Sequence, residues 1–514
     1  MHDIILTTLN ARYAHAAFGL RYLMANLGPL RDRAKILEFD VNHRPLDVIE
    51  SILAENPKIV GLGVYIWNAA PATQLVAELK RLRPDIRIVL GGPEVSYETD
   101  QQEICRVADY VLTGEADLAF ADLCAQLLDS RPPATHCIAA ELPDFSKLVL
   151  PYDFYDDQDV AHRVIYVEAS RGCPFSCEFC LSSLDIPVRN VPLDSFLAAM
   201  LRLLDRGVRL FKFVDRTFNL NLNFSRAILE FFLQRWRPGL FLHFEMIPDR
   251  LPEGLREAIR WFPPGALQFE VGIQTFNPEV AARISRKQDN DRLSENLRFL
   301  RRETGVHVHA DLIAGLPGED LQSFAAGFDR LMELAPQEIQ VGLLKRLRGT
   351  PIVRHDTEWG MVHSPNPPYE ILQTGCIDFP TMQQLRRFAR HWDLVSNSGN
   401  FLSSAPRLWL DGSPFAGFLL FSQWLHARQP ASHGISLHRL AELLFDYLIG
   451  PMGQSPVDAA NSVWEDYQRG GRSDRPAFLL KHLPPQAMKI QRRPIANALP
   501  KRQHRHLGQG REAG

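Results

Sequence analysis

The sequence is poor in cysteine and contains no long apolar run. Only seven cysteines occur among 514 residues, and three of them fall between residues 173 and 180. Such a clustered, odd number argues against a disulfide framework and favours a metal site in a reducing compartment. No apolar run is long enough to cross a membrane, and the opening MHDIILTTLNARYAH lacks the basic and apolar segments of a secretory signal. We therefore expect a cytoplasmic protein with no membrane partner.

The chain also lacks an excess of charge of one sign. Lys and Arg number 57 against 60 Asp and Glu, which gives a net charge of −3. A nucleic-acid partner would therefore need a local basic patch. Apolar residues make up 46% and charged residues 23%, which excludes a mostly disordered chain. At this length we expect two or three domains.

Short apolar runs alternate with helical segments over residues 1–135. The expected strands lie at residues 3–8, 35–39, 59–64, 86–90 and 109–112. This alternation of strands and helices predicts an α/β domain of the flavodoxin or Rossmann-like type. Such domains bind ligands beyond the carboxyl ends of their parallel strands. The Pro-rich residues 136–160 are predicted to form a linker.

A second βα alternation runs over residues 161–358. The expected strands lie at residues 164–168, 210–214, 241–246, 267–272, 307–313 and 338–344. Six βα units predict a partial (β/α)6 TIM-like barrel. Residues 359–488 are predicted to be mostly helical, with their many aromatic side chains in a core. Residues 489–514 hold seven Lys or Arg and one acidic residue, and we expect a disordered basic tail.

The segment RGCPFSCEFC directly follows the first strand of the predicted barrel. Its cysteines, Cys173, Cys177 and Cys180, are spaced as Cys-x3-Cys-x2-Cys. Thiolates are the usual ligands of iron–sulfur clusters, and a cubane has four iron sites, so three cysteines leave one iron open. An open iron can hold a small chelating ligand, as the open position of a catalytic zinc site does. A zinc knuckle is the alternative, but no fourth Cys or His with zinc spacing lies nearby.

This segment resembles the signature of radical S-adenosylmethionine (SAM) enzymes. The resemblance implies a [4Fe-4S] cluster on Cys173, Cys177 and Cys180, with SAM chelating the fourth iron by its amino and carboxylate groups. It also implies reductive cleavage of SAM to methionine and a 5′-deoxyadenosyl radical. Phe179 matches an aromatic residue that would pack on the adenine.

Further segments resemble the same superfamily in chain order. Asp215 follows the second strand, where related enzymes hold the methionine moiety of SAM, and Glu245 resembles the carboxylate that contacts the ribose or the amino group. Gln274 closes the fourth strand in a segment like G-I-Q-S. Gly315 lies in a loop like the one that flanks the adenine. The resemblance therefore implies a SAM site along the ends of successive strands.

Two sets of polar residues can be interpreted either as functional or as structural. Arg286 and Lys287 could neutralise the SAM carboxylate, but solvated surface charges fit equally well. His307, His309 and Asp311 alternate along one strand and so project to one face. A metal site or a general base is conceivable there, but we favour a polar lining of the barrel.

A doubly wound domain that precedes such a barrel resembles the class with an N-terminal cobalamin-binding domain, in a branch with a C-terminal helical extension. The residues that match its phosphate- and corrin-facing turns are Asn10 and Tyr13 in the first loop, Gly91, Gly92, Pro93 and Glu94 in the fourth, and Gly114 and Glu115 in the fifth. The resemblance implies bound cobalamin, because glycines let the backbone approach a large planar ring. The alternative is a generic flavodoxin-like domain; a nicotinamide site is disfavoured, since no Gly-x-Gly-x-x-Gly follows the first strand.

The first loop departs from the pattern that supplies an axial histidine in many cobalamin domains. That pattern is Asp-x-His-x-x-Gly, whereas here Tyr13 takes the Asp position before His15 and Phe18 replaces the glycine. We therefore expect no protein histidine on cobalt. The residues expected to approach an otherwise open lower face are Tyr65, Trp67 and Asn68.

These resemblances together imply an enzyme that methylates an unactivated carbon through radical chemistry at bound cofactors. A small-molecule or peptide substrate and a flavodoxin or ferredoxin as electron donor are the expected partners. Nucleic acid is not expected, but the basic tail keeps tRNA modification open. Two further functions also stay open, namely a cobalamin-assisted cyclisation or rearrangement without methyl transfer, and a non-catalytic cobalamin-binding sensor.

Overall fold

The structure is a computed structural model that describes residues 2–184, 187–409, 412–431, 433–469, 472, 474, 476–483 and 500–507. The chain divides into two compact units. Unit 1 comprises residues 1–216, 345–353 and 364–370, and unit 2 comprises residues 217–344, 354–363 and 371–514. Among the described residues, no helix combines the length and the apolar character that a membrane crossing needs.

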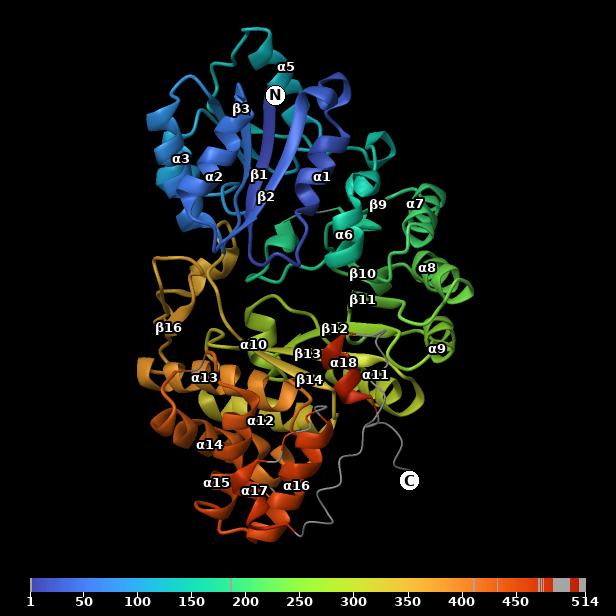
Figure 1. The fold of residues 1–514 in the computed structure, drawn as a ribbon, viewed down its shortest axis with the longest axis vertical. Helices are drawn as coiled ribbons and strands as arrows, with labels where there is room; N and C mark the ends of the chain where they lie inside the picture. Colours follow the sequence, from blue (N-terminus) through green and yellow to red (C-terminus); the bar gives the residue numbers. More distant parts are fainter. Residues whose placement is uncertain are drawn as a thin grey trace. The chain divides into compact units, whose positions relative to one another are not determined.

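Unit 1 begins with a six-stranded parallel sheet in the order β2-β1-β3-β4-β5-β6 (Figure 1). Its strands are β1 (Ile4–Asn10), β2 (Ala34–Asp40), β3 (Ile59–Gly63), β4 (Arg87–Gly91), β5 (Tyr110–Thr113) and β6 (Cys137–Ala139). Its helices are α1 (Phe18–Ala25), α2 (Pro45–Ala54), α3 (Ala69–Leu82), α4 (Glu103–Val107) and α5 (Ala119–Leu128). The order reverses between β1 and β3, as in flavodoxin-like sheets. The predicted doubly wound domain is confirmed.

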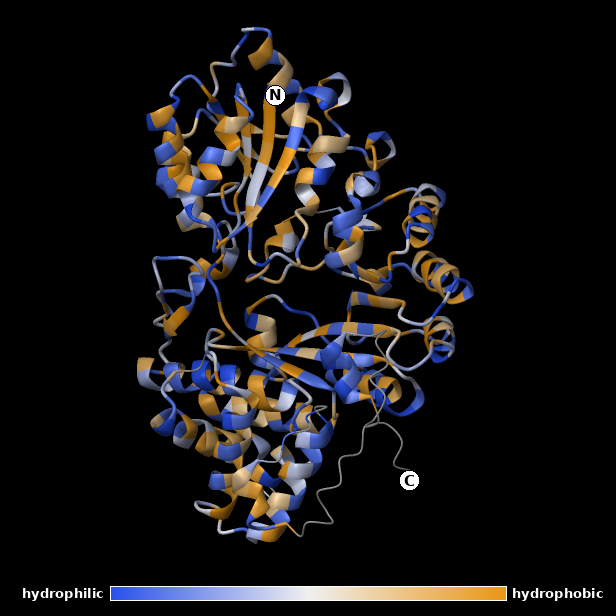
Figure 2. Cartoon of the chain, in the orientation of Figure 1, coloured by the Kyte–Doolittle hydropathy of each residue, from blue (hydrophilic) through white to orange (hydrophobic). Residues whose placement is uncertain are grey.

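The sheet is held by a core on each of its faces. β1 is buried along its whole length, and alternate residues point to opposite sides. Ile5 and Leu9 join the core under α2, α3 and α4, whereas Ile4 and Leu6 join the core under α1 and α5. Figure 2 shows the resulting apolar colouring of β1. Burial on both faces explains why these strands read as continuous apolar runs.

The rest of unit 1 contains the first part of the predicted barrel. Its elements are α6 (Asp157–His162), β7 (Ile165–Val167), β8 (Ser170–Arg171), β9 (Arg189–Asn190), α7 (Leu193–Asp205) and β10 (Leu210–Phe213). β7 pairs with β10 in parallel, as expected for consecutive barrel strands. β8 and β9 form a short antiparallel ribbon that encloses the cysteine loop between its two strands.

Unit 2 continues the alternation with four parallel strands in the order β14-β13-β12-β11. These strands are β11 (Phe241–Met246), β12 (Leu267–Gln274), β13 (His307–Ala314) and β14 (Glu338–Leu343). The connecting helices are α8 (Leu222–Gln234), α9 (Glu253–Arg260), α10 (Pro278–Arg283), α11 (Asn290–Glu303) and α12 (Leu321–Glu333). All six predicted barrel strands are therefore present, and polar and apolar residues alternate along those of unit 2 (Figure 2).

The C-terminal part of unit 2 is mostly helical, as predicted. After the short ribbon β15 (Val362–His363) and β16 (Ile371–Gln373) come α13 (Phe379–Trp392), α14 (Pro414–Arg428), α15 (Leu437–Ile449), α16 (Pro456–Arg469), α17 (Ala477–Leu480) and α18 (Lys501–His506). Its aromatic side chains form the expected core. Phe388, Trp392 and Phe418 are buried. The rings of Phe388 and Trp392 pack on Phe328, and the ring of Phe418 packs on both Phe388 and Trp392.

Two segments differ from the expectations drawn from the sequence. The predicted linker, residues 136–160, contains β6, which extends the sheet edge beside β5, and also α6. β6 is only three residues long, too short for a period to emerge. In the predicted disordered tail, residues 500–507 are ordered as α18 and its flanks, whereas residues 489–499 and 508–514 lie outside the described residues.

Candidate active site and cofactor cavity

The cysteine loop follows directly on β8. Gly172 has a φ of 97°, in the left-handed region that favours glycine, so the chain turns sharply out of the strand. Cys173 and Cys177 are buried, and Cys180 is partly exposed. The amide of Cys180 donates to the carbonyl of Cys177 at 3.1 Å, which winds the end of the loop. Burial raises the pKa of the Cys173 thiol, and the neighbouring Cys180 and Cys177 sulfurs add to this effect.

The three cysteines of the loop are the residues predicted to hold a cubane. In the part of the chain that the structure describes, no three His, Cys, Asp or Glu side chains are grouped as a metal ion would require. The cysteines of a [4Fe-4S] cluster bind different iron atoms, so their sulfurs do not have to meet at one point. The cluster on Cys173, Cys177 and Cys180 therefore stays a prediction.

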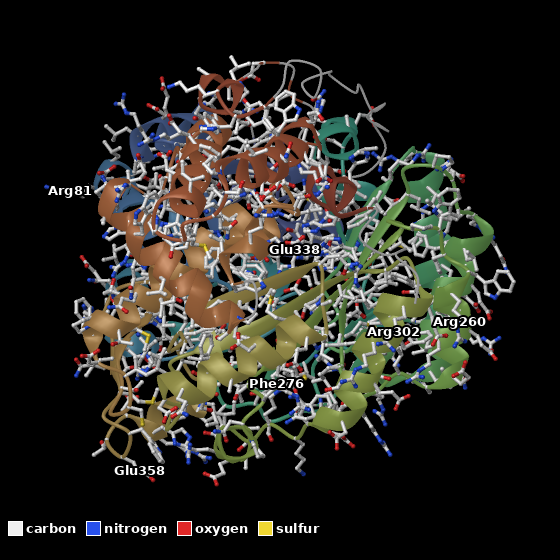
Figure 3. The ribbon with its side chains drawn as sticks, turned by 90° about the horizontal axis from the view of Figure 1, so that it is seen from below. Arg81, Arg260, Phe276, Arg302, Glu338 and Glu358 are labelled. Atoms are coloured by element: carbon white, nitrogen blue, oxygen red, sulfur yellow. The ribbon has the colours of Figure 1, made fainter. Side chains whose placement is uncertain are left out.

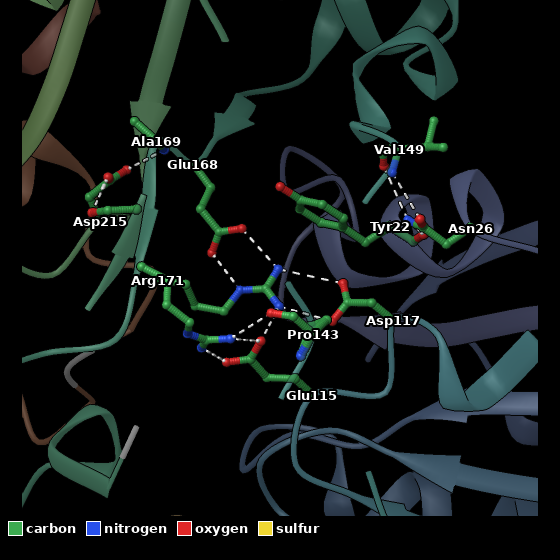
Figure 4. Close-up of polar contacts among 12 residues, drawn as sticks. Tyr22, Asn26, Glu115, Asp117, Pro143, Val149, Glu168, Ala169, Arg171 and Asp215 are labelled. Carbon is green, nitrogen blue, oxygen red and sulfur yellow. Dashed lines mark hydrogen bonds and ion pairs between the residues drawn. The ribbon is translucent and has the colours of Figure 1, made fainter. Parts of the chain in front are cut away.

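Arg171, two residues before Cys173, is the centre of a buried network of ion pairs (Figure 4). Its guanidinium lies 2.9 Å from Glu168, 2.9 Å from Asp117 and 2.7 Å from Glu115. Arg189 of β9 pairs with Glu115 as well. Because Glu115 and Asp117 lie in the loop after β5, the network joins the N-terminal sheet to both strands that flank the cysteine loop.

Asp215, which we expected at the methionine moiety of SAM, is bonded to the strand segment that precedes the cysteine loop. Its carboxylate accepts hydrogen bonds from the amide of Ala169 at 3.0 Å and the hydroxyl of Ser170 at 2.7 Å (Figure 4). Burial raises the pKa of Asp215 to about 7 in spite of these bonds. Asp215 therefore orders the entry to the loop, and its contact with SAM stays a prediction.

A cavity of about 390 Å³ lies on the face of the N-terminal sheet that α1 and α5 cover. It extends along β3, β4 and β5 to their carboxyl ends, where doubly wound sheets bind their ligands. The predicted cobalamin residues that line it are Gly91, Gly92, Pro93, Gly114 and Glu115. Glu168 and Arg171 also line it, so the ion network borders the cavity. Sequence reasoning gave no role to Arg171, Asp117 or Glu168, although Arg171 adjoins the cysteine motif.

Glycines keep the sheet side of the cavity thin. A Cβ on Gly61 would lie 2.7 Å from the Phe120 ring. Gly92 has a φ of 106°, and a Cβ there would lie 2.5 Å from the carbonyl oxygen of Val64. Neither position accepts a side chain without a backbone or ring shift, so the close packing at these two points requires glycine.

The first loop places three predicted residues at the end of β1, outside the lining of the cavity. Asn10 donates to Glu38 at 2.8 Å. Tyr13 is half exposed, with the guanidinium of Arg163 4.6 Å from its ring centre. His15 is hydrogen-bonded to the hydroxyl of Tyr166 on β7, and burial lowers its pKa. One nitrogen of His15 is thus engaged, and the expected absence of a protein histidine on cobalt stays a prediction.

The loop after β3 holds the aromatic residues suggested for the lower face of cobalamin. Tyr65 and Trp67 stack with ring centres 4.5 Å apart, and 47% of Trp67 is exposed. The Trp67 indole donates to the carbonyl of Leu9 at 3.1 Å, which fixes the ring over the end of β1. Asn68 is fully buried, and its amide donates to Thr8 and Leu9. Tyr65 lines the cavity of this domain, whereas Trp67 and Asn68 lie outside its lining, and Asn68 braces the loop.

Glu94 does not line the cavity. Its buried carboxylate accepts hydrogen bonds from Arg348 at 3.1 Å and from the hydroxyl of Tyr369. Both partners belong to unit 1, although Arg348 lies 254 residues and Tyr369 lies 275 residues after Glu94 in the sequence. Glu94 therefore ties these segments to the loop after β4, a role that no local pattern could indicate.

Unit 2 carries the remaining predicted SAM residues at the carboxyl ends of its strands. Glu245 lies near the end of β11, Gln274 ends β12 and Gly315 follows β13. Gln274 has a φ of 71°, and the pairing of β12 with β13 shifts between Gly272 and Gln274. A non-glycine residue in this conformation is strained, and such strain is concentrated at functional sites. Arg286 donates to the carbonyl of Gly272, which places one of the two suggested cations beside this bulge.

The histidines of β13 belong to a polar face of the unit 2 sheet. His307 pairs with Glu338 at 2.7 Å, and His243 of β11 pairs with Glu270 of β12 at 2.9 Å. His309 lies 3.5 Å from Asp311. These pairs favour the interpretation as a polar lining, since the described residues include no group of three ligands for a metal.

The helix α18 covers the amino-terminal ends of these strands. Arg502 bridges Glu338 and Asp393, at 2.9 Å from each. His506 is buried and hydrogen-bonded to the carbonyl of Asn397 at 3.0 Å. Figure 3 labels Glu338 within unit 2 and the more exposed Arg260 and Arg302 on the helices α9 and α11. Part of the predicted basic tail is thus packed against unit 2.

Comparison with protein families assigns both domains. The B12 binding domain profile matches residues 4–124, and the Radical SAM superfamily profile matches residues 167–331. This is a B12-binding radical SAM protein. A third profile, a protein family of unknown function (DUF4080), matches residues 357–498. The radical SAM domain implies a [4Fe-4S] cluster and SAM, and the B12-binding domain implies cobalamin.

Several curated proteins and solved structures are similar to this radical SAM protein. The cobalamin-dependent radical SAM methyltransferase TokK of Streptomyces tokunonensis is 23% identical over 441 residues, which cover 77% of this chain and 62% of TokK. The structure of OxsB, a cobalamin-dependent SAM radical enzyme, matches with a TM-score of 0.60 at 13% identity, over 94% of this chain and 82% of OxsB. TsrM from Kitasatospora setae, with cobalamin and a [4Fe-4S] cluster bound, matches with a TM-score of 0.55 at 17% identity, over 68% and 77% of the two chains. The chain spans less than two thirds of the length of the first curated relatives that it matches.

The residues of the B12-binding radical SAM protein fit these cofactors. The buried thiols of Cys173 and Cys177, with Cys180, offer soft ligands in a loop with no competing metal group among the described residues. The cavity falls within the usual range of roughly 300–1,000 Å³ for ligand pockets. Its glycine-thinned floor and largely apolar walls suit the nucleotide tail of cobalamin.

Proposed function

We propose that this protein is a cobalamin-dependent radical SAM enzyme that transfers a methyl group to an unactivated carbon. The observation that supports the proposal most directly is the Arg171 network, which ties the cysteine loop to the cavity of the B12-binding domain in one compact unit. When bound, the cofactors supply reductive cleavage of SAM and a methyl donor. The protein has to hold both cofactors at a fixed separation and exclude water.

The residues proposed for the two cofactors lie in distinct places. Cys173, Cys177 and Cys180 would hold the cluster, with Phe179 beside the adenine of SAM. Glu245, Gln274 and Gly315 stay the residues proposed from the sequence for further contacts with SAM. The residues proposed for cobalamin are Asn10, Tyr13, Trp67, Asn68, Gly91, Gly92, Pro93, Glu94, Gly114 and Glu115. Tyr65, Trp67 or Asn68 would approach an otherwise open lower face of the corrin.

The tRNA alternative draws less support from the tail. Arg502 is engaged by Glu338 and Asp393, and Arg505 donates to the carbonyl of Ser398 at 3.0 Å. An RNA-binding arm needs its cations free for phosphates. We therefore favour a small-molecule or peptide substrate, with a flavodoxin or ferredoxin as electron donor in the reducing cytoplasm.

The first test is cleavage of SAM by the anaerobically reconstituted full chain with dithionite as reductant. We expect 5′-deoxyadenosine from the wild type, none from Cys177→Ala, and wild-type yield from the matched control Cys376→Ala, because Cys376 is an exposed cysteine outside the loop. Cleavage by Cys177→Ala would contradict the cluster assignment. No cleavage by the wild type would favour a non-catalytic cobalamin sensor.

The second test separates methyl transfer from rearrangement. SAM with a deuterated methyl group is incubated with the reduced, cobalamin-loaded protein, and the cobalamin is extracted for mass spectrometry. Methyl transfer predicts that the label enters the cobalamin pool. Label that remains only in SAM and methionine would favour a cyclisation or rearrangement without methyl transfer.

A further inference from the structure

Tyr22 belongs to the wall of the cavity in the B12-binding domain and carries a buried hydroxyl without a hydrogen-bond partner among the described residues. It lies on α1, lines the cavity and is only 2% exposed. Among the described residues its hydroxyl oxygen is buried and has no hydrogen-bond partner. The guanidinium of Arg171 lies 5.1 Å from the centre of the Tyr22 ring. The Phe18 ring packs edge-on against the Tyr22 ring, with the ring centres 5.0 Å apart.

The charged groups of the same wall do not satisfy this hydroxyl. Glu115, Asp117 and Glu168 are all paired with Arg171 instead. Burial raises the pKa of Tyr22 well above its usual value, and the nearby carboxylate of Glu168 raises it further, so the hydroxyl keeps its proton. A buried donor without an acceptor costs about 1–3 kcal/mol. A ligand that brings an acceptor to this point recovers that cost.

Cobamides differ in the base that ends their nucleotide tail. When the tail leaves cobalt, a benzimidazole or purine base exposes the ring nitrogen that had been the metal ligand, and this nitrogen is a hydrogen-bond acceptor. A phenolic base, such as p-cresol, has no such nitrogen. Buried in a largely apolar cavity, the nitrogen needs a donor as much as Tyr22 needs an acceptor.

We propose that Tyr22 selects the lower base of the cobamide by donating a hydrogen bond to the free ring nitrogen of a benzimidazole or purine tail. This inference rests on the proposed binding of a cobamide in the cavity and adds which cobamides it accepts. A cavity of about 390 Å³ is large enough for such a base, since one of about 150 Å³ already holds benzene. Tyr22 is thus a specificity-determining residue that acts on the cofactor tail, away from the cysteine loop.

The test compares two cobamides on the full chain by calorimetry or equilibrium dialysis. The probes are cobalamin, which carries dimethylbenzimidazole, and p-cresolyl cobamide. The comparison uses wild type, Tyr22→Phe and the control Tyr110→Phe, because Tyr110 is also buried but donates to the carbonyl of Pro133 outside the cavity. For each protein, the affinity for cobalamin is divided by the affinity for p-cresolyl cobamide. This quotient is then compared between variant and wild type, so that intrinsic differences between the two cobamides cancel.

We expect Tyr22→Phe to weaken cobalamin binding by about tenfold, which corresponds to about 1.4 kcal/mol, and to leave or improve the binding of p-cresolyl cobamide. Tyr110→Phe should keep the wild-type preference. The substitution removes an unpaired buried hydroxyl, so Tyr22→Phe should be at least as stable as the wild type in thermal unfolding. An equal change in both affinities overturns the role of Tyr22 and leaves cobalamin binding standing. If neither cobamide binds the wild type, the proposed cobalamin function fails as well.

Discussion

The buried carboxyl group of Glu319 should make the free energy of unfolding depend on pH. Glu319 lies just after β13 in unit 2 and is 2% exposed. It accepts a hydrogen bond from the hydroxyl of Thr275 at 2.6 Å, while its second oxygen is buried and has no partner among the described residues. Burial raises the pKa of Glu319 to about 7. Replacement by glutamine keeps the shape of the side chain but removes the group that binds and releases the proton.

The sign follows from which state holds the proton. The ordinary pKa of the group is 4.5, so between pH 4.5 and pH 7 the folded chain binds a proton that the unfolded chain releases. Stability therefore falls as the pH rises through this window and becomes constant above pH 7. Each pKa unit corresponds to about 1.4 kcal/mol, so the wild type should lose about 2 kcal/mol between pH 5.5 and pH 8 that Glu319→Gln does not lose.

The assay is urea unfolding of the full chain at pH 5.5 and pH 8, followed by circular dichroism. Contributions of the buried acids Asp215 and Asp466 cancel between wild type and variant. Glu230→Gln serves as the control, because Glu230 is exposed and should behave as the wild type at both pH values. The reasoning is refuted if Glu319→Gln and the wild type lose the same stability between the two pH values.

Three further predictions concern separate parts of the chain. Arg171→Met should lower the free energy of unfolding, measured by urea titration, by about 3–5 kcal/mol, because it leaves buried carboxylates unpaired. The control Arg131→Met removes an exposed ion pair and should lower the same free energy by less than about 0.5 kcal/mol. Gly92→Ala should reduce cobalamin uptake in equilibrium dialysis as well as stability, since its Cβ would meet the Val64 carbonyl at 2.5 Å; unchanged uptake would contradict the proposed floor. The pKa of Glu338 is lowered to about 2, against the effect of burial, by its hydrogen bond to His307 and by nearby charges that include Arg502, so it contributes stability above pH 4.5 that is lost as the pH falls towards 2. Arg502→Gln should therefore unfold at a higher pH in an acid titration, and an unchanged midpoint would show that α18 contributes nothing there.

The sequence was sufficient to predict the two α/β layouts and the helical C-terminal region. Continuous apolar runs such as β1 and alternating strands such as β13 carry strong periodic signals. The cysteine spacing indicated the cluster loop, and glycines such as Gly92 indicated the cavity floor. Local signals of this kind depend only on neighbouring residues.

The remaining features depend on contacts that join distant parts of the chain. Arg348 and Tyr369, far along the chain, hold the carboxylate of Glu94, and no local pattern indicated this contact. The basic character of α18 suggested a solvated tail, whereas Arg502 finds the buried Glu338. Tyr22 occupied an ordinary apolar position of a helix, and only the structure shows that the residue lines a cavity and that its buried hydroxyl has no partner among the described residues. Contacts of this kind follow no hydrophobic period and no sequence motif, so they cannot be predicted from the sequence.

Mössbauer spectroscopy of the anaerobic, iron-reconstituted protein tests the central claim most directly. Three cysteines that leave one corner of a cubane free predict a [4Fe-4S] spectrum in which a single iron changes its signal when SAM is added. Zinc or an empty loop in oxygen-free preparations, or a spectrum that SAM does not alter, would contradict the account.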